Sequence, residues 1–265
     1  MTVQPQPRVK VPLKTIALPN EHGGWGFTLE PVLLGLLVAP TLAGLGLGVF
    51  ALAAFFTRHP LKLWLADVRK GKRFPRTPVA GRFALAYATV GALGLLLAFG
   101  RAEGPFYWPL LAALPLIAVQ LWFDAHNKGR NLLPEVAGAA AMGSVAAGIG
   151  LAGGLEPPLA LGLWLVLAAR SYAAIHYART QVMRARGLAV PFRPAYLAQL
   201  IAVGGLLLGA AAGWVPWLGV LAVGLLLPFS AYTFARPPVP AKVVGWSQMA
   251  FGLLVVVLTA LGVRV

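Results

Sequence analysis

Eight Lys or Arg residues and a single acid, Asp67, are concentrated between positions 58 and 82 of a chain that is otherwise mostly apolar. On a helix, Arg58 and Lys62 would lie on one face because they are four residues apart, and Asp67 would lie on a neighbouring face. Cations in this arrangement favour binding of a phosphate or another anion. Lys70, Lys72 and Arg73 are typical of a loop at anionic lipid headgroups. The ligand contacts predicted in this stretch are Arg58, His59, Lys62 and Arg76.

A second group precedes and enters the first long apolar segment, and it contains Glu21, His22 and Glu30. Glu30 lies about five residues into that segment, roughly 7 to 8 Å at ~1.5 Å per residue. A carboxylate at that depth is costly unless it faces a polar cavity or a cation. Two interpretations stay open: Glu30 belongs to a functional cavity, or it is an interfacial residue paired with a nearby Lys or Arg.

A third group is a turn between two apolar segments, where charged residues accompany turn-forming residues. Gly129 favours a chain reversal, and Asn131 with Pro134 fits the start of the next helix. A helix N-terminus flanked by cations is a natural anion site, although an ordinary loop explains the same residues. The binding residues predicted here are Asp124, Asn127, Lys128, Arg130 and Asn131.

A fourth group lies within a later apolar segment, in which Arg170 is the deepest charge. At about 100° per residue, Arg170 shares one helix face with Tyr177 and Gln181. An arginine at that depth must meet a carboxylate, a carbonyl or water, so this face predicts a polar cavity. The predicted site residues of a second face are Tyr172, His176 and Arg179.

The composition places these groups in a membrane protein. Of 265 residues, 59% are hydrophobic and 11% are charged, and the mean hydropathy is +0.78, which one soluble core cannot bury. A net charge of +15 would suggest nucleic acid in a soluble protein. Here it indicates cytoplasmic loops enriched in Lys and Arg, so we expect no nucleic-acid partner. The absence of cysteine excludes disulfides and thiolate metal sites.

Apolar runs of about 17 to 25 residues predict nine membrane-spanning helices in one all-α bundle. Residues 1–20 would form a cytoplasmic tail, and residues 21–265 a single transmembrane domain in the cytoplasmic membrane of a bacterium. With the N-terminus inside and the C-terminus outside, 19 of the 22 basic residues fall on the cytoplasmic side. The approximate limits of the spans are 25–40, 42–64, 83–100, 106–123, 133–153, 158–182, 195–213, 215–234 and 244–263.

Several of these motifs resemble those of known families. The run Glu21-His22-Gly23-Gly24-Trp25, the Pro-Val-Leu-Leu-Gly at 31–35 and the block 58–77 are similar to the YwiC-like family. More distantly, the order of the polar groups resembles the UbiA superfamily of intramembrane prenyltransferases. That resemblance implies nine helices around a cytoplasm-facing cavity that takes an isoprenoid diphosphate.

The UbiA resemblance also implies magnesium, and here the sequence departs from the family pattern. The first acidic motif retains one carboxylate, Asp67, followed by the pair Arg76 and Thr77. The second motif, laid around Tyr172 or Tyr177, retains no aspartate. Magnesium requires hard oxygen ligands, so a two-metal mechanism is not expected and a magnesium cofactor stays unassigned. A bare anion would instead be bound directly by the basic side chains.

These observations favour a membrane protein that binds an isoprenoid or lipid-like amphiphile, with its phosphate or diphosphate head at the cytoplasmic side. If it is an enzyme, it would be a divergent UbiA-like transferase or a lyase. The alternatives are a membrane carrier of a small anion and a membrane subunit that docks a soluble partner. Against the carrier, the sequence contains no inverted repeat and no matched pair of broken helices. The candidate acid and base residues of an enzyme are Asp67, Glu21, Glu30 and His176.

Overall fold

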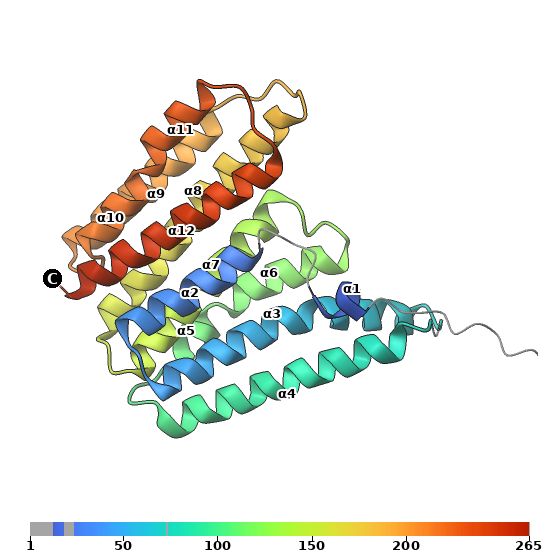
Figure 1. Cartoon of the computed structure of the whole chain (residues 1–265). Coiled ribbons are helices and arrows are strands. Elements are labelled where there is room, and N and C mark those ends of the chain that lie inside the picture. Colours follow the sequence, from blue (N-terminus) through green and yellow to red (C-terminus); the bar gives the residue numbers. More distant parts are fainter. Residues whose placement is uncertain (1–12, 19–23, 73, 265) are drawn as a thin grey trace, which may run out of the picture.

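The computed structural model describes residues 13–18, 24–72 and 74–264, and every regular element within those ranges is an α-helix (Figure 1). This confirms the all-α fold predicted from the apolar runs. The helices are α1 (Leu13–Ala17), α2 (Gly24–Val38), α3 (Leu42–Arg69), α4 (Thr77–Arg101), α5 (Tyr107–Ala112), α6 (Leu114–Ala125), α7 (Leu132–Ala152), α8 (Pro157–Ala185), α9 (Arg193–Ala211), α10 (Trp217–Gly224), α11 (Leu226–Phe234) and α12 (Ala241–Arg264).

Among the residues that the structure describes, seven helical segments are long and apolar enough to cross a membrane: α3, α4, α7, α8, α9, α12 and the pair α10–α11. Helices α2 and α6 are apolar but shorter. Large apolar side chains cover the outer surface, and Leu85, Leu96 and Leu208 are 70%, 66% and 75% exposed. A surface of this extent is suited to contact with lipid tails rather than with water.

Two of the nine predicted spans are not continuous helices, and proline explains both breaks. The segment 106–123 forms α5 and α6, which are separated at Ala113, and the segment 215–234 forms α10 and α11, which are separated at Leu225. In each pair the second helix carries a proline in its first turn, at Pro115 and Pro228. Proline lacks an N–H and its ring clashes with the carbonyl of residue i−4, so the preceding helix ends before it.

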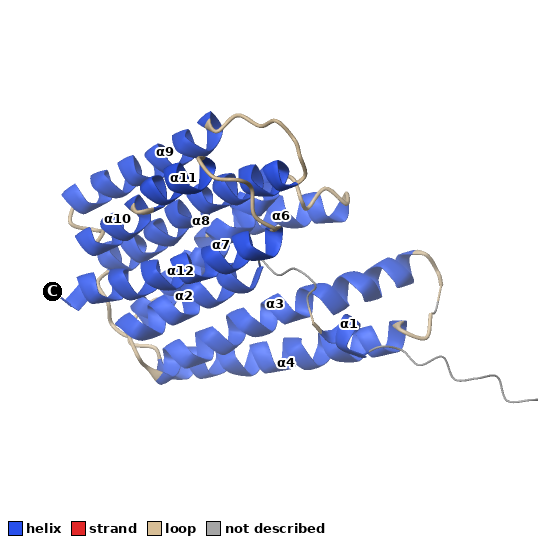
Figure 2. Ribbon diagram, turned by 45° about the horizontal axis from the view of Figure 1, so that its top comes forward, coloured by secondary structure: helices blue, strands red, loops and turns tan. Residues whose placement is uncertain are grey.

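Helix α7 occupies the centre of the bundle, where it packs against α2, α3, α5, α6 and α8. Its buried positions include Gly138 and Gly143, which are small enough for neighbouring helices to approach closely. Helices α3 and α4 form a tight pair along one edge of the molecule, and α9 to α11 lie along the opposite edge (Figure 2). In the α3–α4 pair a Cβ atom on Gly94 would lie 2.6 Å from the Gly46 carbonyl oxygen, so the close approach requires glycine.

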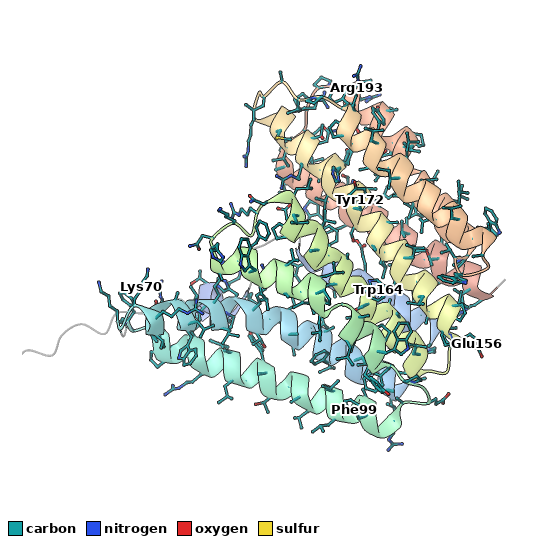
Figure 3. The ribbon with its side chains drawn as sticks, turned by 180° about the vertical axis from the view of Figure 1, so that it is seen from behind. Lys70, Phe99, Glu156, Trp164, Tyr172 and Arg193 are labelled. Atoms are coloured by element: carbon teal, nitrogen blue, oxygen red, sulfur yellow. The ribbon has the colours of Figure 1, made fainter. Side chains whose placement is uncertain are left out.

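Charged residues are concentrated at one end of the bundle. The spans run in alternating directions, so the connections that follow α3, α6, α8 and α11 lie together with α1 at this end (Figure 1). Figure 3 shows Lys70 and Arg193 at this end and Phe99 and Glu156 at the opposite end. We call the end that contains Lys70 and Arg193 the basic end.

The basic end combines many cations with few acids. Its described acids are Asp67, Asp124 and Glu135. At the opposite end, the described charges are Arg101, Glu103, Glu156 and Arg264. The sixteen described cations in or near the basic end are Lys14, Arg58, Lys62, Arg69, Lys70, Lys72, Arg76, Arg82, Lys128, Arg130, Arg179, Arg184, Arg186, Arg193, Arg236 and Lys242.

Candidate functional site

Asp124, at the C-terminal end of α6, pairs with two cations of α3. Arg58 Nε donates to Asp124 Oδ2 at 3.0 Å, and Arg58 Nη2 donates to the same oxygen. Lys62 Nζ lies 3.8 Å from Asp124 Oδ1. Both cations reach one carboxylate because they are one helical turn apart. The structure therefore brings the first and third predicted groups together, although they are far apart in the sequence.

The turn between α6 and α7, residues 126–131, folds around the Asp124 carboxylate. Asn127 has a φ of 55°, a left-handed conformation that asparagine tolerates better than most residues. A Cβ atom at Gly129 would overlap Asp124 Oδ1, so glycine allows the turn to lie against the carboxylate. Helix α7 begins directly after Asn131, as predicted, but the Asn131 side chain makes no capping hydrogen bond.

Arg179 connects the same turn to α8. Its Nη1 donates to Glu135 Oε2 at 2.9 Å and to the backbone oxygen of Arg130 at 3.0 Å. Lys128 and Arg130 have exposed side chains on the turn itself. We call these residues the α6–α7 site, in which five cations surround two acids. Its members are Arg58, Lys62, Asp124, Lys128, Arg130, Glu135 and Arg179.

Asp67 lies at the tip of the α3–α4 hairpin. Its carboxylate accepts hydrogen bonds from Arg76, the N-cap residue of α4, and from Thr77, the first residue of that helix. Arg76 donates from Nε to Asp67 Oδ2 at 3.1 Å and from Nη2 to Oδ1 at 2.8 Å, and Thr77 Oγ1 donates to Oδ2 at 2.9 Å. Asp67 is 1% exposed. The hydrogen bond from Arg76 to this carboxylate raises the pKa of Arg76 above its usual value. Asp67 thus joins the two helices and does not contact the α6–α7 site.

Glu30 and Arg170 form an ion pair in the interior of the bundle. Arg170 Nη2 lies 3.1 Å from Glu30 Oε1 and donates to the backbone oxygen of Gln248 at 2.7 Å. Glu30 is 6% exposed and Arg170 is 2% exposed. The pair joins α2, α8 and α12, and it meets the expectation that the Arg170 charge needs a carboxylate or a carbonyl.

Gly252 makes this pairing sterically feasible. A Cβ atom at Gly252 would overlap the Glu30 carboxylate and would lie 2.8 Å from Arg170 Nη2. Gly252 lies one turn beyond Gln248 on α12, so both residues present the same helix face to the pair. Neither residue was among the predicted site residues, although Gln248 is a polar residue inside an apolar run. We call Glu30, Arg170, Gln248 and Gly252 the buried centre.

The two predicted faces of α8 have different environments. Arg170, Tyr177 and Gln181 are 2%, 2% and 1% exposed, whereas the side chains of Tyr172 and His176 are partly exposed. Tyr177 Oη donates to Thr233 Oγ1 at 3.1 Å, so this part of the face packs against α11. His176 lies 4.6 Å from Tyr172 between ring centroids, and its Nδ1 lies 2.9 Å from the Tyr172 backbone oxygen.

The remaining predicted site residues do not gather at one place. His59 Nε2 lies 3.0 Å from the backbone oxygen of Thr15 on α1. Glu21 and His22 lie outside the described residues. Within the described ranges, no three His, Asp or Glu residues are grouped closely enough to hold a metal ion.

Two open pockets occur on the outer surface. The larger, of about 310 Å³, lies between α1 and α4 at the basic end, and the smaller, of about 120 Å³, lies between α2 and α12 at the opposite end. Neither contains a predicted site residue. The larger is lined by Leu13, Val79, Arg82, Phe83 and Ala86, which are apolar side chains beside a single cation.

The helices and their exposed apolar surface define a polytopic α-helical membrane protein. A family model described as YwiC-like protein matches residues 18–150, which is half of the chain. The chain therefore belongs to the YwiC-like family, as the motifs at 21–35 and 58–77 predicted. No curated protein and no solved structure matches it. The more distant likeness to UbiA prenyltransferases stays a prediction.

Proposed function

We propose that this protein binds an amphiphile with an isoprenoid or lipid-like tail, and that the basic end binds the phosphate or diphosphate head of this ligand. The observation that carries the proposal is the one-sided distribution of charge, with sixteen described cations and three described acids at the basic end. We propose that this end faces the cytoplasm of a bacterial cell, because inside loops are enriched in Lys and Arg.

The α6–α7 site supports a specific location for the head. Its two acids lie between cations from three segments, since Arg58 and Lys62 come from α3 and Arg179 comes from α8. The exposed Lys128 and Arg130 add two further charges on the turn. Charge-assisted hydrogen bonds from such groups are roughly twice as strong as neutral ones, so they suit a diphosphate.

We propose that this binding does not depend on magnesium. Asp67, the one carboxylate left from the first UbiA-like motif, already accepts three hydrogen bonds from Arg76 and Thr77. A metal ion would have to displace those donors to reach it. The catalytic roles assigned to Asp67, Glu21, Glu30 and His176 stay predictions, and so do the carrier and docking alternatives.

Equilibrium binding of tritiated farnesyl diphosphate tests the proposal. The full chain is held in nanodiscs of zwitterionic lipid, and binding is measured with magnesium and with EDTA. We expect saturable binding in both conditions, weakened about tenfold or more by the double substitution Lys128→Gln and Arg130→Gln, since one lost charged hydrogen bond is worth ~1.5–3 kcal/mol.

The matched control is the double substitution Arg193→Gln and Lys242→Gln, which removes two charges from the same end but outside the α6–α7 turn. These residues begin α9 and α12, and we expect a change of less than about threefold, since their charges act through solvent. An equal loss of affinity in the two double variants would show that the ligand responds to the overall positive charge of this end and not to a specific site. Binding that disappears with EDTA would contradict the metal-free proposal and favour a magnesium-dependent transferase.

A further inference from the structure

Arg170 is a buried cation whose hydrogen-bonding capacity the described protein satisfies only in part. Of its three nitrogens, Nη2 has two acceptors, whereas Nε and Nη1 have none among the described residues. A guanidinium carries five N–H groups, so three of them lack an acceptor. An unsatisfied donor in a buried site is unfavourable, and a charged one more so.

Gln248, whose backbone contacts the same guanidinium, carries further unsatisfied polar atoms on its side chain. Its side-chain Nε2 and Oε1 are buried and have no partner among the described residues. Its backbone oxygen accepts from Arg170, so this residue lies directly against the guanidinium. Buried polar groups are normally hydrogen-bonded, and several unpaired ones together indicate an occupant.

We infer that the buried centre is an intramembrane binding site for a carboxylate, whose oxygens accept from Arg170 and Gln248. The unpaired groups are mainly donors, so the occupant must be rich in acceptors. Glu30 shows that this guanidinium already binds a carboxylate at 3.1 Å. A phosphate is less suited, because it is larger and brings a second negative charge into a low-dielectric interior.

Charge balance requires that a proton enters with the ligand. In the observed state Glu30 and Arg170 neutralise each other, and a second carboxylate would leave one negative charge in the bundle interior, which is costly. A proton from solvent therefore binds a Glu30 carboxylate oxygen, the ion pair with Arg170 opens, and the ligand carboxylate becomes the partner of Arg170. The complex then holds one positive and one negative charge, as before.

Arg170 is the charged group that faces Glu30. Helices α3, α7, α8 and α12 pack against α2, and the other described titratable or charged groups on them lie further along each helix. Within the described part of the chain, none of those groups forms an ion pair with Glu30, whereas Arg170 does at 3.1 Å. They are Arg58, His59, Lys62, Asp67 and Arg69 on α3, Glu135 on α7, Tyr172, His176, Tyr177, Arg179 and Arg184 on α8, and Lys242 and Arg264 on α12.

Glu30 lies in the half of α2 that is nearer the basic end. Trp25, in its first turn, packs on Phe55 and Phe56 of α3, with ring centroids 5.7 and 5.4 Å apart. Those residues lie roughly 20 Å before the end of α3 at ~1.5 Å per residue. Helix α2 therefore begins well inside the basic end, and Glu30 lies less than two turns beyond Trp25.

The test measures binding of radiolabelled acetate and decanoate to the full chain in nanodiscs of zwitterionic lipid between pH 5.5 and 8, with empty nanodiscs subtracted. We expect saturable carboxylate binding that tightens by up to tenfold for each unit of decreasing pH. Binding of acetate identifies a small free acid as the ligand class, and binding of decanoate alone identifies an amphiphile. Saturable binding of inorganic phosphate with equal affinity, or no saturable carboxylate binding, overturns the inference.

Variants locate the binding at the buried centre. Glu30→Gln mimics the protonated acid, so at pH 8 it should bind the carboxylate at least tenfold more tightly than the wild type and show no pH dependence. Arg170→Lys should weaken carboxylate binding at least tenfold, and Gln248→Leu should weaken it about fivefold. If Arg170→Lys does not fold, the other two variants still decide the matter. Equal affinity and equal pH dependence in Glu30→Gln and wild type would overturn the inference.

Gln199→Leu is the matched control for a buried glutamine. Gln199 is 1% exposed, and its Nε2 donates to Ser230 Oγ at 2.8 Å, whereas its Oε1 has no partner among the described residues, so only the donor half of this amide is engaged within the protein. We expect this variant to be less stable but to bind the carboxylate with unchanged affinity. Equal weakening in Gln199→Leu and Gln248→Leu would contradict a local role for Gln248. The assay contains no prenyl diphosphate, so failure of the proposed headgroup binding leaves its result intact.

Discussion

Replacement of Gly252 by alanine should open the ion pair of the buried centre. The added Cβ would overlap the Glu30 carboxylate and lie 2.8 Å from Arg170 Nη2, so one of the two side chains must move. Glu30 can withdraw because its carboxylate is the end of a flexible chain, but doing so removes it from Arg170. The substitution thus perturbs a charge pair without removing either charge.

The size of the effect follows from the geometry of the pair. At an effective dielectric constant of about 20, opposite charges attract by ~5 kcal/mol at the observed 3.1 Å and by ~3 kcal/mol at about 5 Å. The hydrogen bond that is lost contributes partly to this same Coulomb attraction, so the two terms do not add in full. We therefore expect the free energy of unfolding to fall by about 2–4 kcal/mol. Alanine in a helix returns roughly 0.5–1 kcal/mol, which leaves a net destabilisation of about 1–3.5 kcal/mol.

Reversible unfolding in mixed micelles of mild detergent and SDS, followed by tryptophan fluorescence, measures this loss. Gly245→Ala is the matched control on the same helix, since a Cβ there meets no atom within 4 Å, and it should be neutral or slightly stabilising. In a Glu30→Ala background the cost of Gly252→Ala should fall below about 1 kcal/mol, because the overlap with the Glu30 carboxylate is gone and only the contact with the flexible end of Arg170 remains. Equal effects of the two glycine substitutions would refute the reasoning.

Three further outcomes are expected. Thr77→Val should lower the free energy of unfolding by about 1–2 kcal/mol, because it removes a donor from the buried Asp67 carboxylate, and a neutral result would show that Arg76 alone suffices. Asp124→Asn should cost about 1 kcal/mol at low salt and less in high salt, measured by the same unfolding assay, and a cost independent of salt would argue against an electrostatic role. The chain has no cysteine, so in whole cells an impermeant maleimide should label Glu156→Cys directly but label Arg186→Cys only after permeabilisation. The reverse pattern would show that the basic end faces outward.

Much of the helical framework could be predicted from the sequence because apolar length is a local property. The run 42–64 became α3, which continues to Arg69, and the run 133–153 became α7, which begins after Asn131 and ends at Ala152. The breaks at Ala113 and Leu225 were missed, since apolar content does not report the effect of a proline on backbone geometry.

The candidate sites were only partly predictable, because pairing is a tertiary property. Helical periodicity correctly separated the buried Arg170 and Tyr177 from the partly exposed His176 on α8. The sequence indicated that Arg170 needs an acceptor, but Glu30 lies 140 residues away and no local pattern connects the two. Gln248 was not predicted, because a single amide within an apolar run does not indicate a binding site until its neighbours in the fold are known.

The relative affinities of farnesyl diphosphate and farnesol test the central claim most directly. The two ligands share a tail and differ in the head, so their ratio isolates the contribution of the basic end. In metal-free nanodiscs we expect the diphosphate to bind at least about a hundredfold more tightly. We expect this ratio to fall about tenfold or more in the Lys128→Gln, Arg130→Gln variant, in line with the loss of at least one charged hydrogen bond. Equal affinity of the two ligands, or a ratio unchanged in that variant, would contradict headgroup recognition at the α6–α7 site.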